Sequence, residues 1–214
     1  MAKETEIKLR ASPETLAALR SHPLLETRRQ SEWKTGTLFN QYYDTAARDL
    51  AGARVALRMR RDGEQCIQTL KSRGQSVSGL SERNEWDWYS DKPELDTTLL
   101  DDSCWPQALA DLDKRLLQPV FTTDFQRCKA LLRWERETAG GVETIEVEAA
   151  LDQGKVVAGD REEAICELEL EIRQGPAIAV LELARALADD LALMPCDISK
   201  AERGYRLFDP ASYD

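Results

Sequence analysis

Charged and apolar residues alternate, residue by residue, along several strand-length segments of this chain. Residues 4–9 read Glu-Thr-Glu-Ile-Lys-Leu, residues 57–60 read Leu-Arg-Met-Arg, and residues 167–172 read Glu-Leu-Glu-Leu-Glu-Ile. Successive side chains of a β-strand point to opposite faces of the sheet, so each segment gathers its charges on one face and its apolar residues on the other. The sequence therefore predicts a sheet with one ionic face and one apolar face.

The ionic face carries acids on some strands and bases on others. A single strand of this kind is usually a solvated sheet surface, because antiparallel sheets commonly expose one side to water. The recurrence favours another arrangement, since like charges repel unless opposite charges lie on neighbouring strands. If the sheet closes into a barrel with this face inward, the charges line a tunnel for polyphosphate and metal ions. The alternation places on this face Glu4, Glu6, Lys8, Arg58, Arg60, Lys71, Arg83, Glu85, Asp87, Arg127, Lys129, Glu146, Glu148, Glu167, Glu169 and Glu171.

The net charge of −10 argues against several classes of partner. A chain this acidic repels nucleic acid and anionic membrane surfaces at long range, so we expect no nucleic-acid and no membrane partner. It has neither an apolar run of the roughly 18 residues that a membrane span needs nor a signal-peptide pattern, so we expect a cytoplasmic protein. The five cysteines are scattered and His22 is the single histidine, which indicates neither a zinc site nor a Ser–His–Asp mechanism.

The patterns predict a single domain over residues 1–214, because no linker or internal repeat divides the chain. Leu/Asp-rich residues 94–117 predict a helical insertion, and residues 176–192 predict an amphipathic C-terminal helix. A further helix is expected at 12–20, and strands are expected at 3–10, 37–44, 53–61, 64–72, 80–90, 119–136, 142–151 and 163–172. Turns are expected at residues 61–64, at Gly140-Gly141 and at Gly154.

Short motifs along nearly the whole chain occur in an order typical of one superfamily. They are Glu4-x-Glu6-x-Lys8, Gln41-Tyr42-Tyr43-Asp44-Thr45, Leu57-Arg58-Met59-Arg60, Thr69-Leu70-Lys71, Arg83-x-Glu85, Thr123-Asp124-Phe125-x-Arg127, Leu151-Asp152-Gln153-Gly154, Glu167-Leu168-Glu169-Leu170-Glu171 and Ser199-Lys200-x-x-Arg203-Gly204-Tyr205. On these residues the chain resembles the CYTH superfamily of triphosphate tunnel metalloenzymes, and within it the bacterial inorganic triphosphatases. The resemblance implies an α+β fold, a closed eight-stranded antiparallel β-barrel with flanking helices. It also implies metal-dependent hydrolysis of inorganic triphosphate to diphosphate and phosphate.

The resemblance further implies a role for each ionic residue. Ligands of Mg²⁺ or Mn²⁺ would be Glu4, Glu6, Glu167 and Glu169, with Glu85, Glu148 and Glu171 as additional carboxylates. Phosphate oxygens would be held by Lys8, Arg58, Arg60, Arg83, Arg127, Lys129, Lys200 and Arg203. Lys71 is the expected base that activates water, because a lysine among other cations can have its pKa lowered, and Tyr42 would assist it. The sequence leaves open whether Tyr42 or Tyr43 faces the tunnel.

The ionic residues do not by themselves distinguish one triphosphate substrate from another. Adenylate cyclase, thiamine or nucleoside triphosphatase, and processing of RNA 5′ ends are alternatives within the superfamily, and a non-catalytic polyphosphate-binding module is an alternative from another class. An organic substituent needs an apolar or stacking pocket, whereas aromatic residues make up only 7% of the chain, which favours inorganic triphosphate. Many bacterial relatives carry a CHAD domain after the tunnel domain; the sequence ends at Asp214, so we expect its contribution to be absent. We expect a monomer or a homodimer.

Overall fold

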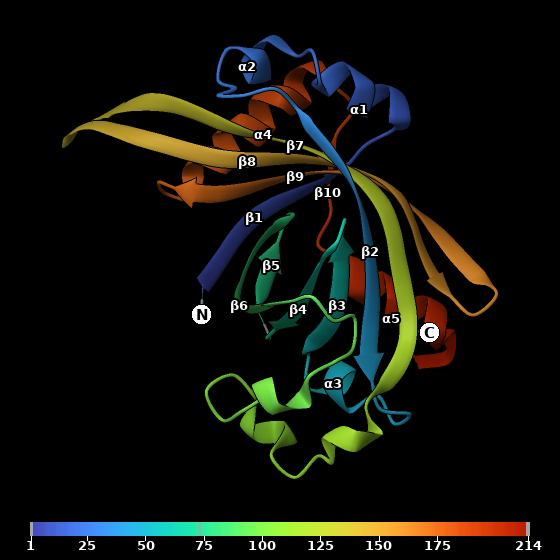
Figure 1. The fold of residues 1–214 in the computed structure, drawn as a ribbon. Coiled ribbons are helices and arrows are strands. Elements are labelled where there is room, and N and C mark those ends of the chain that lie inside the picture. The colour runs from blue at the N-terminus through green and yellow to red at the C-terminus, as the bar shows by residue number, and fades with distance from the viewer. Residues whose placement is uncertain (1, 73, 213–214) are drawn as a thin grey trace.

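Eight antiparallel strands form a closed barrel in this computed structural model, which describes residues 2–72 and 74–212 (Figure 1). In ring order they are β1 (Ala2–Arg10), β9 (Arg161–Gln174), β8 (Gly141–Ala158), β7 (Gln118–Thr138), β2 (Lys34–Asp44), β3 (Ala56–Asp62), β4 (Gln65–Lys71) and β6 (Leu80–Ser90). The ring closes because β6 also pairs with β1. Two short strands, β5 (Gln75–Val77) and β10 (Met194–Pro195), pair with β6 and β1. The predicted α+β barrel with eight antiparallel strands is confirmed.

Strand β1 closes the barrel by pairing along both of its edges. Its first part pairs with β6, where Glu4 lies opposite Arg83, and its second part pairs with β9, where Glu6 lies opposite Glu171. On β1, Glu4 thus faces a base of β6, whereas Glu6 faces an acid of β9. The register of a strand with one buried face is fixed by which side chains must point inward.

Helices cover the outer, apolar face of the barrel on two sides (Figure 1). On one side α1 (Pro13–Leu19), α2 (Pro23–Glu26) and α4 (Ile178–Asp190) pack on β1, β7, β8 and β9 through a core that includes Leu9, Leu168 and Leu183. On the other side α3 (Asp49–Gly52) and the 3₁₀ helices η1 (Thr97–Leu99), η2 (Gln107–Leu109) and η3 (Lys114–Leu116) lie over β3, β4 and β6. The short helices expected at 94–117 are therefore 3₁₀ turns.

Helix α5 (Lys200–Phe208) packs against β7, β8 and β9 and was not predicted. Its Tyr205 meets Phe121 edge to face, with ring centroids 5.0 Å apart, and Phe121 in turn stacks on Tyr42. Gly204 permits this approach, because a Cβ there would lie 2.1 Å from the Phe121 ring. Helix α5 thus adds an aromatic contact to the barrel through Tyr205 and ionic contacts through Lys200 and Arg203. The short helix η4 (Pro210–Ser212) follows.

The predicted turns agree with the structure at two positions, and the turn predicted at a third position, a glycine, is wrong. Gly63 adopts a left-handed conformation in the hairpin between β3 and β4, and the β7–β8 hairpin turns at Gly140, as predicted. The turn predicted at Gly154 is wrong, because β8 continues to Ala158. A Cβ at Gly154 would lie 2.2 Å from the carbonyl oxygen of Asp124, so this glycine permits close approach of β7. Within the described part of the chain, no helix has the length and apolar character to cross a membrane.

Candidate functional site

A cavity of about 360 Å³ lies inside the barrel and is lined mainly by charged side chains. Most of the residues predicted to carry the chemistry line it: Glu4, Glu6, Lys8, Tyr42, Arg58, Arg60, Lys71, Arg83, Glu85, Arg127, Lys129, Glu148, Glu169, Glu171 and Lys200. Two predicted site residues, Glu167 and Arg203, are buried behind this lining. The lining residues come from all eight barrel strands and from α5, so closure of the barrel is what brings them together.

Tyr42 is the tyrosine that faces the cavity. Its ring stacks on Phe121 at a centroid distance of 4.6 Å, whereas Tyr43 packs with the apolar residues beneath α3 and the 3₁₀ helices. Burial raises the pKa of the Tyr42 hydroxyl, but Arg58, with Arg60 and Lys71, outweighs burial and lowers it below its ordinary value. The structure thereby settles the choice that the sequence left open.

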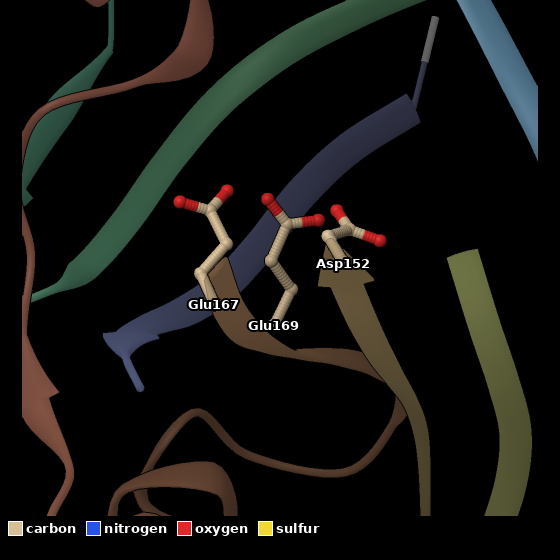
Figure 2. Close-up of side chains that lie close together, drawn as sticks. All are labelled: Asp152, Glu167 and Glu169. Atoms are coloured by element: carbon tan, nitrogen blue, oxygen red, sulfur yellow. The ribbon is translucent and has the colours of Figure 1, made fainter. Parts of the chain in front are cut away.

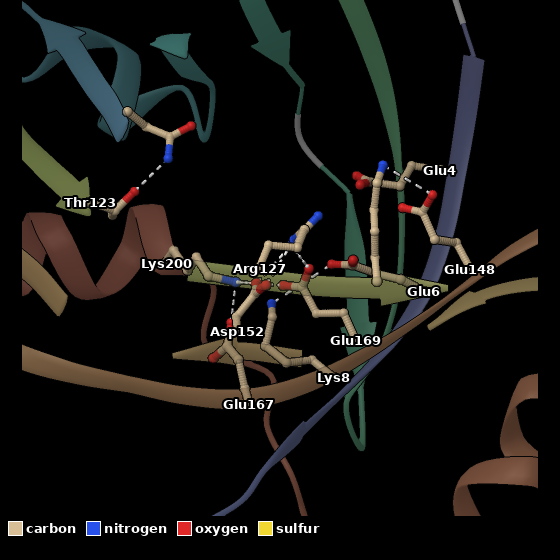
Figure 3. A network of polar contacts seen from close by, with 12 residues as sticks. Glu4, Glu6, Lys8, Thr123, Arg127, Glu148, Asp152, Glu167, Glu169 and Lys200 are labelled. Carbon is tan, nitrogen blue, oxygen red and sulfur yellow. Dashed lines mark hydrogen bonds and ion pairs between the residues drawn. The ribbon is translucent and has the colours of Figure 1, made fainter. Parts of the chain in front are cut away.

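Three carboxylates converge at one end of the cavity around the ammonium group of Lys200 (Figures 2 and 3). Asp152, Glu167 and Glu169 place carboxylate oxygens within 4.8 Å of one another. Lys200 Nζ donates to Asp152 at 2.7 Å, to Glu169 at 2.8 Å and also to Glu167. We call Asp152, Glu167, Glu169 and Lys200 the lysine-centred cluster. The ammonium group of Lys200 therefore already lies among the carboxylate oxygens of this cluster.

Two arginines complete the neutralisation of the lysine-centred cluster. Arg127 donates to both Asp152 oxygens, at 2.8 and 2.7 Å, and to Glu169 at 2.5 Å, while Arg203 donates to Glu167 at 3.3 Å and to Glu163. Burial raises the pKa values of Asp152 and Glu169, but the surrounding cations outweigh burial and lower both. These acids therefore stay ionised with little residual charge.

A second group of three carboxylates, Glu4 and Glu6 on β1 and Glu171 on β9, is less well neutralised. Glu6 lies directly opposite Glu171, and its cationic neighbours Lys8 and Arg83 are 3.7 and 3.8 Å away. Burial raises the pKa of Glu171; Arg173 opposes this at 2.7 Å, but Glu4 and Glu6 raise it further, to about 7. We call Glu4, Glu6 and Glu171 the acidic wall. Glu4 is its best-neutralised member, with Lys71 at 2.8 Å, whereas the ion pairs of Glu6 are long and the pKa of Glu171 stays raised.

The opposite imbalance occurs on β3, where Arg58 and Arg60 form what we call the basic wall. The Nε atom of Arg58 is buried and has no hydrogen-bond partner among the described residues. Arg60 donates from Nε to Asn40 at 2.8 Å, and no carboxylate in residues 2–72 or 74–212 forms an ion pair with it. Burial, together with repulsion from Arg58 and Arg127, lowers the pKa of Arg60 to about 9. A buried group of this kind favours a bound anion.

Lys71 lies in a setting different from the one expected for a base. Its Nζ donates to the two carboxylate oxygens of Glu4 at 2.8 and 2.9 Å, and Glu85 lies 3.3 Å away. Burial lowers the pKa of Lys71, but Glu4 and Glu85 outweigh burial and raise it. The expected lowering of the Lys71 pKa is therefore wrong for this arrangement, because the nearest charges are acids.

Sequence reasoning missed several ionic residues of the site, among them Asp152 and Arg173. Arg173 lines the cavity and donates to Glu171 at 2.7 Å and contacts Glu148 at 3.1 Å. Both residues continue the alternation of predicted strands, Asp152 after Glu146 and Glu148, and Arg173 after Glu171. They were missed because those strands were predicted to end at 151 and 172, whereas β8 continues to Ala158 and β9 to Gln174.

Comparison with known proteins places this barrel among related chains. A family model described as the CYTH domain matches residues 2–205. An inorganic triphosphatase of Haemophilus influenzae is 31% identical over 207 residues, which is 97% of this chain and 55% of that protein. The chain thus spans about half the length of this curated relative.

Two solved structures share the fold. A Hippeastrum protein, described as an adenylyl cyclase candidate with a dominant triphosphatase activity, superposes with a TM-score of 0.63 at 24% identity, over 94% of this chain and 95% of that one. A Bacillus halodurans protein described as an adenylate cyclase candidate superposes with a TM-score of 0.51 at 20% identity, over 89% and 94%. At these identities the likeness shows the fold alone.

Proposed function

Because the chain belongs to the CYTH family, we propose that it hydrolyses inorganic triphosphate to diphosphate and phosphate inside the barrel, with Mg²⁺ or Mn²⁺ as cofactor. The observation that carries the proposal is the pair of unbalanced walls. The basic wall on β3 and the acidic wall on β1 and β9 lie on opposite sides of the ring, separated by two strands one way and three the other. A bound polyanion with a divalent cation would neutralise both walls at once.

The acidic wall is where the residues present fit a divalent cation best. Carboxylate oxygens are the ligands that Mg²⁺ and Mn²⁺ prefer, and the pKa of Glu171, raised to about 7, marks an acid that gains from a nearby cation. We propose Glu4, Glu6 and Glu171 as the principal ligands, with Glu85, Glu148 and Glu169 as supporting carboxylates. The bound metal would supply neutralisation of phosphate charge and polarisation of water.

The lysine-centred cluster fits a metal ion less well, although its oxygens lie closer together. Lys200 already donates to all three of its carboxylates, so a metal ion would have to displace a buried ammonium group. We therefore assign Glu167 to support of the fold, as the partner of Lys200 and Arg203. Lys200 lines the cavity and remains a candidate phosphate ligand, but its Nζ is shared with three acids.

The cations of the cavity would bind and orient the substrate. Guanidinium groups hold phosphate oxygens in a two-pronged manner, and we propose Arg58 and Arg60 as the principal phosphate ligands, because Arg60 pairs with no carboxylate among the described residues and the Nε of Arg58 has no hydrogen-bond partner there. The other proposed phosphate ligands are Lys8, Arg83, Arg127 and Lys129. We retain Lys71 and Tyr42 as candidates for handling the proton of the attacking water. Lys71 would do so only when Glu4 no longer keeps it protonated.

An adjoining cavity provides the one observation in favour of an organic triphosphate. It has a volume of about 570 Å³, shares Lys71 and Arg83 with the main cavity, and includes Val55 and Tyr205 in its lining. These two side chains offer an apolar surface to a substituent. We rank this second, because the substrate named for the 31% identical relative is inorganic.

We also propose that the protein works in the cytoplasm as one tunnel domain, as a monomer or homodimer, without nucleic-acid or membrane partners. All five cysteines are free thiols, four of them buried, in keeping with a reducing compartment. The net charge of −10 disfavours polyanionic surfaces as partners.

Phosphate release from inorganic triphosphate, ATP and thiamine triphosphate tests the function, each measured with Mg²⁺, with Mn²⁺ and with EDTA. We expect metal-dependent turnover that is fastest on inorganic triphosphate. A preference for ATP or thiamine triphosphate would move the assignment to the organic class. Binding without turnover under all metal conditions would contradict hydrolysis and favour a polyphosphate-binding module.

A further inference from the structure

A third cavity, of about 190 Å³, adjoins the main one between β2, β3 and β7. The two cavities share Arg60, Asp62, Arg127 and Lys129, so a chain-like ligand in the main cavity has a continuous path into the smaller one. Lys34 lines only the smaller cavity. We call Lys34, Arg60, Asp62, Arg127 and Lys129 the outer pocket.

The outer pocket carries four cations and one carboxylate in a chain with a net charge of −10. Arg127 is committed to Asp152 and Glu169, and Lys129 reaches Glu148 only at 3.4 Å. No ion pair joins Lys34 or Arg60 to a carboxylate in the described parts of the chain. The pocket therefore has positive charge to offer to an anion.

Strand register adds an independent observation. Lys34 on β2 lies directly opposite Lys129 on β7, so two ammonium groups project on the same side of neighbouring strands. Like charges placed directly opposite each other destabilise a sheet. An anion bound between Lys34 and Lys129 would turn this repulsion into attraction.

We propose that the outer pocket is a subsite for a further phosphate of linear inorganic polyphosphate, so that chains of four or more phosphates bind with their extra unit between Lys34 and Lys129. The inference rests on the proposed function, because the first three phosphates must occupy the main cavity. A phosphate suits this position better than a metal ion or a carboxylate-rich peptide. It is small enough for the pocket and offers several anionic oxygens to two lysines.

Binding of inorganic triphosphate and tetraphosphate to the full chain tests the proposal, measured by calorimetry with Mg²⁺ at low salt. Lys34→Ala should weaken tetraphosphate binding by about three- to tenfold and leave triphosphate binding unchanged, since one charge-assisted contact is lost. Lys34→Arg should restore tetraphosphate binding. Lys92→Ala, which removes the same charge from an exposed loop outside both cavities, is the matched control.

The outcomes separate this inference from the function on which it rests. Equal weakening of triphosphate and tetraphosphate binding by Lys34→Ala would overturn the subsite, because it would mean general attraction of anions. No change for either ligand would overturn it as well. Failure of the wild-type chain to bind triphosphate would instead contradict the proposed function.

Discussion

The barrel holds two groups of three carboxylates, and they differ in charge balance more than in composition. In the lysine-centred cluster, Lys200 and Arg127 lower the pKa values of Asp152 and Glu169. In the acidic wall, burial and the neighbouring acids raise the pKa of Glu171 to about 7 although Arg173 donates to it. The first group is a completed ion-pair network, whereas in the second the ion pairs of Glu6 are 3.7 and 3.8 Å long and the pKa of Glu171 stays raised.

This difference teaches how to identify a cation site among many acids. The oxygens of the lysine-centred cluster lie within 4.8 Å of one another, which is the geometry expected of metal ligands. Yet burying charges is costly unless they are paired, and that cluster already has its pairs. Residual charge, which the acidic wall retains, is therefore a better guide here than the proximity of oxygens.

Removing the central cation should have the largest effect. Lys200→Met would leave Asp152 and Glu167, both almost fully buried, with one positive charge too few. We expect the free energy of unfolding at pH 7 to fall by about 3–5 kcal/mol, as is typical when one partner of a buried ion pair is removed. Chemical denaturation monitored by circular dichroism measures this loss.

Arg83→Met is the matched variant on the acidic wall. Arg83 reaches Glu4 and Glu6 only at 3.6 and 3.8 Å and is more exposed than Lys200, so its loss should cost about 1 kcal/mol or less. Equal losses for Lys200→Met and Arg83→Met would contradict the distinction between the two groups.

Glu6→Gln should have the next largest effect, on turnover rather than on folding. The substitution keeps the shape of the side chain but removes a carboxylate that lies between Lys8 and Arg83. We expect at least about a 100-fold loss of metal-dependent phosphate release, equivalent to about 3 kcal/mol, and weaker Mn²⁺ binding by calorimetry.

The control for Glu6→Gln is Glu135→Gln on the exposed end of the β7–β8 hairpin. It removes one negative charge far along the strand from the cavity, and phosphate release should not change. Full activity in Glu6→Gln would remove the acidic wall from the metal assignment.

The sequence predicted the barrel and its inward residues well because strand alternation is a local property. Glu4, Glu6, Arg58 and Arg60 were placed correctly on the inner face by the twofold period of a β-strand alone. Closure of the barrel cannot be predicted from any one segment, and it was inferred from the resemblance to a known family.

The charge balance of the site could not be predicted from the sequence, because it depends on contacts between segments that are distant along the chain. Lys71 and Glu4 are 67 residues apart, and their ion pair reverses the expected direction of the Lys71 pKa shift. Asp152 was missed for a different reason: Gly154 was interpreted as a turn, although it serves the close approach of β7. A glycine in the sequence is compatible with a turn or with the close approach of a neighbouring strand, and only the packing of the folded chain distinguishes the two.

Glu171→Gln should have a smaller effect that depends on pH. The folded-state pKa of about 7 lies above the ordinary value of 4.5, so the fold favours the protonated acid. Stability from this group is fully present below pH 4.5 and is lost as pH rises through 7. Without metal, Glu171→Gln should therefore stabilise the protein by up to about 3 kcal/mol at pH 8 and by almost nothing at pH 4.5.

Thermal unfolding with EDTA at both pH values measures the effect of Glu171→Gln. Added Mn²⁺ should stabilise the wild-type chain at pH 8 more than the variant, because the cation relieves the same repulsion. A stability difference that does not change with pH would show that Glu171 is ionised throughout and that the acidic wall is balanced.

The smallest effect should appear in the titration of Lys71 itself. Of the three acids that raise the pKa of Lys71, Glu4 contributes most, followed by Glu85 and then Glu6. In metal-free protein, Glu4→Gln should lower the pKa of Lys71, because burial and Arg58 are then opposed only by the weaker effects of Glu85 and Glu6. Glu85→Gln should lower it less, since Glu85 lies at 3.3 Å rather than 2.8 Å. NMR titration of the lysine side-chain resonances measures the pKa of Lys71 in both variants. An unchanged pKa in Glu4→Gln would mean that the acidic wall does not control the protonation of Lys71.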